Sequence, residues 1–98
     1  MDIKIDRDGS KMVMTVSGRI DTLTAPELTA KKSELDGVED LILDITDVDY
    51  ISSAGLRALL TFEQIMEDQG ELKLRGVCNN VMDIFEITGF SEMFTIIE

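Results

Sequence analysis

The chain has 98 residues, of which 9 are basic and 20 are acidic, so its formal net charge is −11. This length suits one domain, spanning residues 1–98, with a hydrophobic core of its own. The acidic balance disfavours a nucleic-acid partner, because contact with phosphates needs clustered lysine and arginine. The single cysteine excludes an internal disulfide and fits the reducing cytoplasm. With no signal-like start and no apolar run of about 18 residues, we expect a soluble cytoplasmic protein without a membrane partner.

The first half of the chain predicts a β-hairpin followed by a helix. Apolar and polar residues alternate on both sides of an Asp-Gly pair over residues 1–17, which indicates two antiparallel strands. Thr24 and Glu27 then have the spacing of a capping box, with Pro26 in the first turn of the helix. We expect this helix to end near Gly37, because glycine readily adopts the left-handed conformation of a helix terminus.

The second half of the chain alternates strands and helices. Residues 41–45 form the most apolar run and predict a central strand covered on both faces. The elements expected after it are a helix over about 53–69, a strand over 71–75, a helix capped by Asn79 or Asn80 and ended by Gly89, and a strand over 94–97. The order is ββαβαβαβ, which predicts an α/β fold with a mixed sheet of four to five strands.

The connections between strands bring two segments together. Helical crossovers join the second predicted strand to the third and the third to the fourth, so these strands should be parallel. Residues 18–24 follow the second strand, and residues 44–53 follow the third. Because the carboxyl ends of parallel strands meet at one edge of a sheet, we expect Asp21 and Ser53 to be neighbours in one surface patch.

Ser52 and Ser53 fall where the second predicted helix begins. A serine there commonly caps the helix by accepting a hydrogen bond from a free N–H group, and we expect one serine to cap while the other faces solvent. A nucleophilic serine needs a base, but the chain has no histidine and no Ser-x-x-Lys pattern at this position. We therefore expect no enzyme activity. Gly55 lacks a side chain, so another backbone or a ligand is expected to come close to it.

Four carboxylates lie near the same turn, but their pattern does not indicate a metal site. They lack the regular spacing and central glycine of a calcium loop, which predicts a solvated acidic rim instead. These residues are Asp21, Asp44, Asp47 and Asp49. No glycine-rich loop ends in Gly-Lys-Ser or Gly-Lys-Thr, as phosphate binding of that kind requires. Cys78 has no second cysteine or histidine and is expected to be a small buried residue. We expect neither a metal nor a cofactor.

Phosphorylation of Ser53 is a further alternative to a purely capping role. A phosphate adds about −1.5 to −2 charges at pH 7, which a helix N-terminus stabilises by roughly 0.3–1 kcal/mol. The fold would tolerate the group, whereas a protein docked over the patch would meet added negative charge beside Asp21. A loss of about 2.7 kcal/mol is already a hundredfold loss of affinity. The modification would therefore act as a binding switch that needs no refolding.

Three segments of the chain resemble the bacterial STAS domain, and specifically the single-domain anti-sigma factor antagonists. They are Gly18-Arg19-Ile20-Asp21-Thr22-Leu23-Thr24-Ala25-Pro26-Glu27-Leu28, Leu41-Ile42-Leu43-Asp44 and Tyr50-Ile51-Ser52-Ser53-Ala54-Gly55-Leu56-Arg57. The similarity extends over essentially the whole chain. Its specificity lies in the combination of the Gly-Arg-Ile-Asp segment with the Ser-Ala-Gly-Leu segment.

The resemblance implies a small sheet with its helices mainly on one face. It also implies a protein-binding module whose partner is an anti-sigma factor that is itself an ATP-dependent serine kinase. In this family the unphosphorylated antagonist binds the kinase and frees a sigma factor, which regulates transcription. Phosphorylation releases the partner, and a phosphatase that acts on the phosphoserine resets the switch.

The resemblance also implies roles for individual residues. The phosphorylated serine of the family precedes a small residue and Gly-Leu, which corresponds to Ser53 here. Asp21 corresponds to a position used in partner contact, and Asp44 to a polar position at the end of the strand below the site. The residue before the phosphoserine is often aspartate in relatives, but it is Ser52 in this chain. Ser52 is therefore an alternative acceptor.

These observations predict a non-enzymatic, phosphorylation-switched binding protein. Its expected contact surface consists of Asp21, Thr22, Ser52, Ser53, Gly55 and Arg57. A bulky residue at Gly55 is expected to weaken binding more than it weakens stability. The alternative is a STAS scaffold or adaptor subunit of a stress-signalling or lipid-transport complex that is not regulated by phosphorylation.

Overall fold

The computed structural model describes residues 1–98, and its strands and helices follow the predicted order. The elements are β1 (Asp2–Asp8), β2 (Lys11–Ile20), α1 (Ala25–Ala30), the 3-10 helix η1 (Lys31–Leu35), β3 (Asp40–Ile51), α2 (Ser53–Glu67), β4 (Glu71–Arg75), α3 (Asn79–Thr88), the 3-10 helix η2 (Phe90–Glu92) and β5 (Thr95–Ile97). The strands form one sheet in the order β1-β2-β3-β4-β5. The β1–β2 pair is antiparallel and the other neighbours are parallel, so the predicted mixed sheet is confirmed with five strands.

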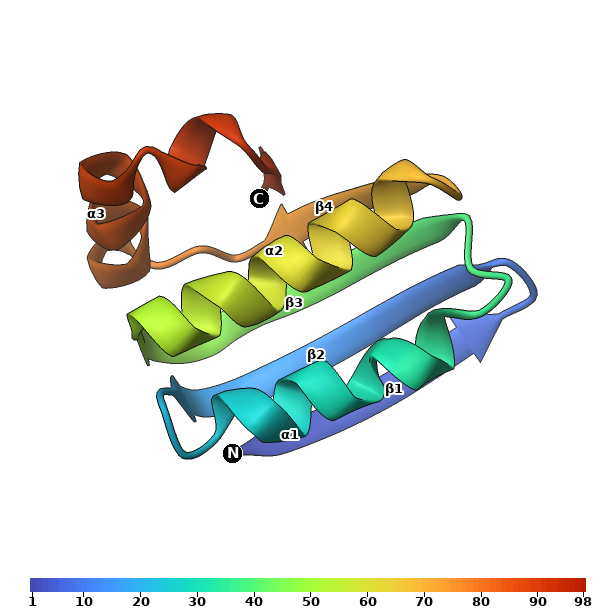
Figure 1. Ribbon diagram of the computed structural model, residues 1–98, viewed down its shortest axis with the longest axis horizontal. Coiled ribbons are helices and arrows are strands. Elements are labelled where there is room, and N and C mark those ends of the chain that lie inside the picture. The colour runs from blue at the N-terminus through green and yellow to red at the C-terminus, as the bar shows by residue number, and fades with distance from the viewer.

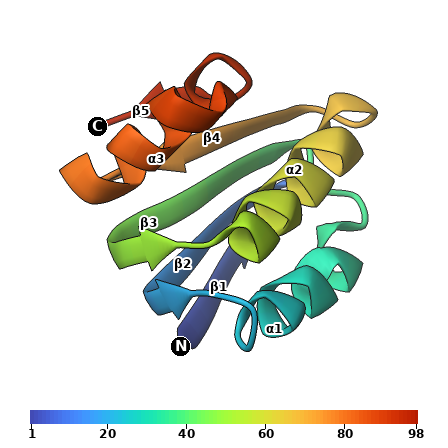
Figure 2. The same cartoon turned by 60° about the vertical axis from the view of Figure 1, so that its left-hand side comes forward.

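The helices gather on one face of this sheet, as expected. Figure 1 shows α1 and α2 side by side in front of the strands, and Figure 2 shows α3 near the carboxyl end of β3. Between helices and sheet, 23 apolar residues are buried in one cluster. Met12, Met14 and Val16 of β2 illustrate the pattern, because every second side chain of that strand points into the core.

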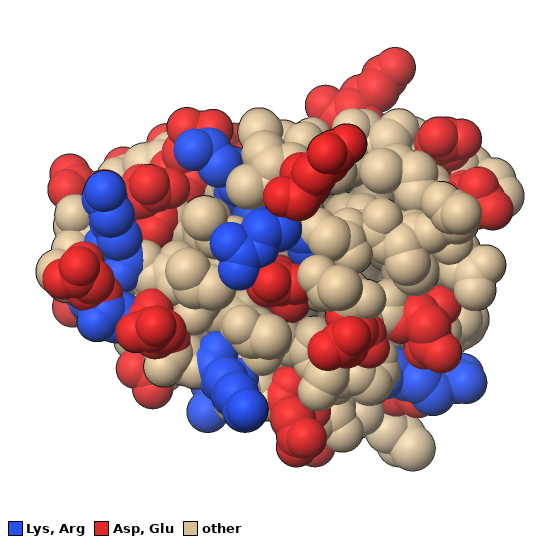
Figure 3. All heavy atoms as spheres, turned by 180° about the vertical axis from the view of Figure 1, so that it is seen from behind, with Lys and Arg blue, Asp and Glu red and all other residues tan.

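The opposite face of the sheet carries no helix. Figure 3 shows this face, where acidic and basic side chains surround uncharged ones. In β3, Ile42 and Asp44 point to this side and are only half-buried, whereas Leu41, Leu43 and Ile45 between and beside them are buried. The prediction that the central strand is covered on both faces is therefore wrong. The residues of β3 are mostly apolar because one side of the strand packs in the core, while its open side carries few polar residues.

β3 is longer than the apolar run that predicted it. The strand continues to Ile51 and pairs with the end of β2, where the register shifts twice. These irregularities change the period of burial, so that Ile45, Val48 and Ile51 are buried at steps of three residues. A strand with this spacing lacks the alternation from which strands are predicted. Residues 46–51 were expected to be a turn and are strand instead.

Two helix boundaries also differ from the prediction. The first helix is α-helical only to Ala30 and then narrows to the 3-10 helix η1, which ends at Leu35. At the start of α3, Cys78 occupies the cap position, and neither asparagine after it caps the helix. Cys78 is half-buried rather than buried, and its thiol donates a hydrogen bond to the carbonyl oxygen of Val48 at 3.3 Å. That contact fastens the start of α3 to β3.

Candidate functional site

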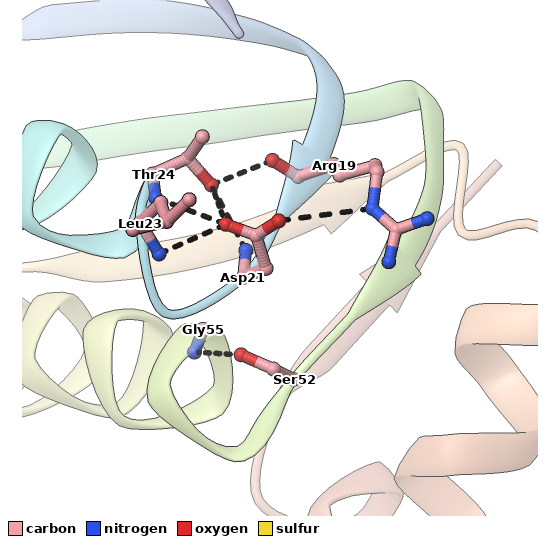
Figure 4. A network of polar contacts seen from close by, with 6 residues as sticks. All are labelled: Arg19, Asp21, Leu23, Thr24, Ser52 and Gly55. Carbon is pink, nitrogen blue, oxygen red and sulfur yellow. Dashed lines mark hydrogen bonds and ion pairs between the residues drawn. The ribbon is translucent and has the colours of Figure 1, made fainter.

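Ser52 and Ser53 divide the two roles that a serine can have at a helix start. Ser52 has extended backbone angles, and its Oγ accepts a hydrogen bond from the N–H group of Gly55 at 3.3 Å (Figure 4). Ser53 is the first residue of α2 and its side chain is exposed. The expectation that one serine caps the helix while the other faces solvent is confirmed. The first turn of α2 contains no acidic residue, so nothing there compensates the positive end of the helix dipole.

Gly55 is buried beneath this turn and does not face solvent. A Cβ atom on Gly55 would lie 2.6 Å from Cγ1 of Ile51, 2.7 Å from Cγ2 of Ile20 and 2.8 Å from the carbonyl oxygen of Ile20. Of the two expectations for this glycine, close approach of another backbone is therefore confirmed. A side chain at this position would point at the end of β2 and at β3, so a bulky residue at Gly55 would disturb the packing first. This geometry contradicts the expectation that such a change would affect binding more than stability.

The segment between β2 and α1 is a turn organised by Asp21. Its Oδ1 accepts hydrogen bonds from the N–H groups of Leu23 at 3.0 Å and Thr24 at 3.1 Å (Figure 4). The Thr24 hydroxyl accepts a bond from the N–H group of Asp21 at 2.9 Å and donates one to the carbonyl oxygen of Arg19 at 2.7 Å. Two side chains thus satisfy the polar backbone groups of the turn reciprocally.

This arrangement replaces the predicted capping box. Thr24 is the residue before α1, but its side chain makes no capping hydrogen bond. Its hydroxyl is committed to the turn instead, and the main-chain oxygen of Asp21 accepts the bond from the N–H group of Ala25 at 2.8 Å. The capping-box prediction is wrong because Oδ1 of Asp21 already accepts the N–H group of Thr24 that Glu27 would accept in such a box, and the N–H group of Glu27 donates to the main-chain oxygen of Thr24 at 2.9 Å.

The carboxylate of Asp21 is half-buried and ionised. The hydrogen bond from the backbone N–H group of Thr24 is the main cause that holds the pKa of Asp21 below the usual value. Partial burial acts in the opposite direction but is outweighed. Arg19 contributes as well, with Nε 3.7 Å from Oδ2 of Asp21. The guanidinium of Arg19 also lies 4.5 Å from the centre of the Tyr50 ring, which is cation–π geometry between β2 and β3.

The two turns form one patch, as the parallel topology predicted. The N–H group of Ser52 donates to the carbonyl oxygen of Ile20 at 2.8 Å, so the residues before Asp21 and Ser53 are directly bonded. Figure 4 shows the Asp21 turn beside the first turn of α2. A groove of about 480 Å³ extends from this patch between α1 and α2, lined by Thr22, Ala25, Pro26, Thr29, Ala30, Ala54 and Arg57. Thr22 and Arg57 are exposed, which makes them accessible to a partner.

Asp44 lies away from this patch. It is in the middle of β3, seven residues before Ile51, which corresponds to roughly 23 Å along an extended strand. Its Oδ2 lies 2.9 Å from Nη2 and 3.0 Å from Nε of Arg75, while its Oδ1 accepts bonds from the hydroxyl and N–H groups of Thr46 at 2.6 and 3.0 Å. Burial raises the pKa of Asp44, but these bonds outweigh it and hold the pKa below the usual value. The expectation that Asp44 ends its strand below the site is wrong, and its role is to pair β3 with β4.

Two properties of the whole molecule complete the geometry. No group of three or more histidine, cysteine, aspartate or glutamate side chains is arranged to hold a metal ion. None of the helices combines the length and the apolar character that crossing a bilayer requires. Asp47 and Asp49, which were expected to belong to an acidic rim, are exposed on the last part of β3. What the patch offers is therefore a solvent-facing hydroxyl, a fixed polar turn and a groove beside them.

Residues 2–98 match the family model described as the STAS domain. The chain belongs to the STAS domain family. It is 34% identical over 99 residues to BtrV of Bordetella bronchiseptica, which bears the name of an anti-sigma factor antagonist, covering 98% of this chain and 85% of that protein. It is 33% identical over 94 residues to the anti-sigma-B factor antagonist of Listeria monocytogenes, covering 93% of this chain and 82% of that protein.

Solved structures share the fold of this STAS domain. An anti-sigma factor antagonist from Mycobacterium paratuberculosis superposes with a TM-score of 0.86 at 22% identity, covering 97% of this chain and 83% of that one. The Bacillus cell fate determinant SpoIIAA in its phosphorylated form superposes with a TM-score of 0.74 at 16% identity, covering 99% of this chain and 92% of that one. At these identities the likeness establishes the architecture.

Three residues of the STAS domain patch were not predicted from the sequence. Leu23 is 85% exposed in the Asp21 turn, and Tyr50 is 39% exposed at the end of β3 with Arg19 against its ring. For Leu23, the sequence contained one indication of exposure, namely an apolar residue between two threonines in a turn. The pairing of Arg19 with Tyr50 depends on the register of β2 against β3, which local sequence does not contain.

Proposed function

We propose that this STAS domain is an anti-sigma factor antagonist whose binding is switched by phosphorylation of Ser53. Its partner is an anti-sigma factor that is also an ATP-dependent serine kinase, and a phosphatase reverses the modification. In the unphosphorylated form the domain binds the kinase and frees a sigma factor, so that it regulates transcription from the cytoplasm. The relatives named as anti-sigma factor antagonists, together with the intact serine, support this assignment.

The observation that carries the proposal is the different environment of the two serines. Ser52 is half-buried and its Oγ is engaged in the helix cap, whereas Ser53 is exposed. A kinase needs a hydroxyl that it can reach without breaking the start of α2, and this favours Ser53 over Ser52 as the acceptor. The absence of acidic residues from the first turn of α2 leaves the dipole available to a phosphate.

The same geometry explains how a phosphate would act without refolding the domain. The added charge of about −1.5 to −2 at pH 7 would stand beside the ionised Asp21. In the free protein that charge is solvated, but under a docked partner both charges would be partly desolvated and would repel each other. Among the proposed contact residues, Thr22, Ser53 and Arg57 are exposed, Asp21 and Ser52 are half-buried, and Gly55 supports them from below.

The chemistry of the patch does not favour an enzyme. The chain contains no histidine, and no side chain is hydrogen-bonded to the Ser53 hydroxyl to take its proton. Membership of the STAS domain family supports a regulatory binding protein. A STAS scaffold or adaptor that is never phosphorylated is the second candidate, because an exposed patch of this kind also suits constitutive binding.

Mass spectrometry after incubation with ATP and the candidate kinase is the decisive test. We expect one phosphate, on Ser53. A phosphate on Ser52 would keep the mechanism and move the site. No phosphate with any such kinase, in a folded sample, would favour the adaptor.

Binding measurements with charge variants complement this test. We expect Ser53→Ala to bind the partner with or without ATP, and Ser53→Asp to bind about a hundredfold more weakly with a melting temperature no lower than that of the wild type. Ser33 is exposed on η1, so Ser33→Asp adds the same charge away from the patch and serves as the matched control. Binding of Ser53→Asp at wild-type strength would contradict the electrostatic switch.

A further inference from the structure

Two aliphatic side chains of the domain are left almost completely in water. Leu23 and Ile87 are each 85% exposed, more than any other large apolar residue. Ile87 lies near the C-terminal end of α3, on a different element from the Asp21 turn. Leu23 lies in the Asp21 turn, between Thr22, which lines the groove between α1 and α2, and Thr24, which helps to organise the turn. Leu23 belongs to the turn that lies beside the first turn of α2 (Figure 4), and this position distinguishes it from an isolated surface leucine.

The backbone that presents Leu23 is fixed from both sides. Its own N–H group is held by Oδ1 of Asp21 at 3.0 Å, and the next N–H group, that of Thr24, is held by the same oxygen at 3.1 Å. The hydroxyl of Thr24 ties the turn back to the carbonyl oxygen of Arg19. Because the backbone is bonded in this way, the direction of the Cα–Cβ bond of Leu23 is fixed, and it leaves the side chain in solvent.

One oxygen of the Asp21 carboxylate is fully engaged within the turn. Oδ1 accepts from two backbone N–H groups and also lies 3.2 Å from the Thr24 hydroxyl. Oδ2 lies 3.7 Å from Nε of Arg19. The bonds to Oδ1 stabilise the turn, and through them Asp21 positions the residue that the turn presents, Leu23.

We propose that Leu23 is the apolar anchor that enters a socket on the kinase-type anti-sigma factor, and that Asp21 is a positioning residue that holds Leu23 out. This inference rests on the proposed function, because it assigns the partner to the same patch. Thr22 and Ala54 line one groove, and each is followed or preceded in the chain by a residue of the proposal, Leu23 and Ser53 respectively. We expect a partner that binds Leu23 to extend across this groove to Ser53, where an added phosphate would weaken its binding.

Leu23→Ala tests the anchor, with Ile87→Ala as the matched control because the two side chains are equally exposed. Affinity for the candidate anti-sigma factor is measured by titration calorimetry without ATP, beside the melting temperature of each variant. We expect Leu23→Ala to weaken binding about tenfold or more and Ile87→Ala to leave it unchanged. Neither change should lower the melting temperature, since both side chains are in water.

Two substitutions at Asp21 test the positioning role. Asparagine keeps the Oδ1 acceptor and loses the charge, whereas alanine loses both. We expect Asp21→Asn to bind within about threefold of wild type, because an exposed ion pair such as that with Arg19 contributes little, and Asp21→Ala to bind as weakly as Leu23→Ala. Rescue by asparagine separates positioning from direct charge contact even if the alanine variant also melts earlier.

The outcomes separate this inference from the function on which it rests. If the wild-type chain binds the partner and Leu23→Ala binds equally well, the anchor is disproved while the antagonist function stands. If Asp21→Asn binds as weakly as Asp21→Ala, the carboxylate contacts the partner directly and the positioning role is disproved. If the wild-type chain binds no kinase-type anti-sigma factor, the proposed function fails and the anchor fails with it.

Discussion

Neither end of α2 carries the charge that its helix dipole favours, but the two ends depart from that preference in different ways. At its N-terminus the helix is capped by Ser52, and its first turn contains no acidic residue. At its C-terminus the last turn contains no basic residue, and the carboxylates of Glu63, Glu67 and Glu71 lie close enough to repel one another. Helix dipoles favour negative charge at the N-terminus and positive charge at the C-terminus. The helix satisfies this preference at neither end.

The two ends of α2 therefore have different consequences for the domain. The N-terminus leaves a place where a negative group would be stabilised, and Ser53 supplies the hydroxyl to which one can be attached. The C-terminus carries a permanent electrostatic cost that the core must offset. Each end also contains a glycine, Gly55 at the N-terminus and Gly70 after the C-terminus, and both pack against other parts of the chain. Substitutions at the two ends should therefore separate function from stability.

The glycines give the largest expected effects. A Cβ atom on Gly70 would overlap the backbone carbonyl group of Glu39, which cannot turn away as a side chain can. We expect Gly70→Ala to lower the free energy of unfolding by about 3 kcal/mol. Gly55→Ala should cost about 1–2 kcal/mol, because alanine favours the helix by about 1 kcal/mol while its Cβ meets Ile20 and Ile51. Urea denaturation of both variants measures these losses.

A control isolates the steric cause. Gly9 has a φ of +62° and nothing within 4 Å of its Cβ position, so Gly9→Ala reports only the backbone cost of losing a glycine. A Gly55→Ala variant that is more stable than wild type would show that the first turn of α2 can shift away from β2. In that case the patch around Ser53 would be less firmly placed than the structure indicates.

The hydrogen bond of the Ser52 cap gives the next-largest expected effect on stability. Ser52→Ala removes the acceptor for the N–H group of Gly55 and should destabilise the domain by about 1 kcal/mol. Ser53→Ala removes a hydroxyl with no partner in the structure and should change stability by less than about 0.5 kcal/mol. Thermal and urea unfolding of the two variants, which differ only in position, test the division of roles. Equal losses would mean that both serines contribute to the cap.

Much of the architecture could be predicted because each local pattern agrees with the fold. The Asp-Gly hairpin, the helical period of α2 and the glycine after it all indicated the elements that form. The crossovers make strands 2 to 4 parallel, and this alone predicts that Asp21 and Ser53 lie at one edge of the sheet. Topology, rather than a motif, located the patch.

The features that could not be predicted depend on contacts between distant segments. The last part of β3 is a strand because it pairs with the irregular end of β2, and Asp47, Asp49 and Tyr50 within it have the composition of a turn. The Thr24–Glu27 spacing indicated a capping box, yet Asp21 engages the same turn from upstream. Asp44 pairs with Arg75 on β4, a contact 31 residues away in sequence. Local patterns contain no information about such pairings.

The smallest expected effect concerns the C-terminal end of α2 and its dependence on pH. One carboxylate oxygen of Glu63 is buried without a hydrogen-bond partner. Burial, followed by the charges of Glu67 and Glu71, raises the pKa of Glu63 above its usual value of 4.5. A carboxyl whose pKa is higher in the folded state than in the unfolded state costs stability as pH rises through the folded pKa, and that cost is relieved as pH falls.

Glu63→Gln should therefore stabilise the domain at pH 7 by about 0.2–0.5 kcal/mol, the size of one like-charge pair on a helix. The advantage of the variant should shrink as pH falls toward 4.5, because the raised pKa of Glu63 lets the wild type take up its proton above that pH. The lowered pKa values of Asp21 and Asp44 act in the opposite sense, because their stabilisation is lost only as pH falls below 3.8. The two effects thus fall in separate pH ranges.

Urea denaturation of Glu63→Gln and wild type at several pH values between 4.5 and 7 measures this advantage. Glu86→Gln, which removes one exposed carboxylate from α3, controls for total charge in a chain whose net charge is −11. An advantage that does not change with pH would mean that Glu63 acts through its shape and not through its charge. The unfavourable charge at the C-terminus of α2 would then no longer distinguish that end of the helix from the end that carries Ser53.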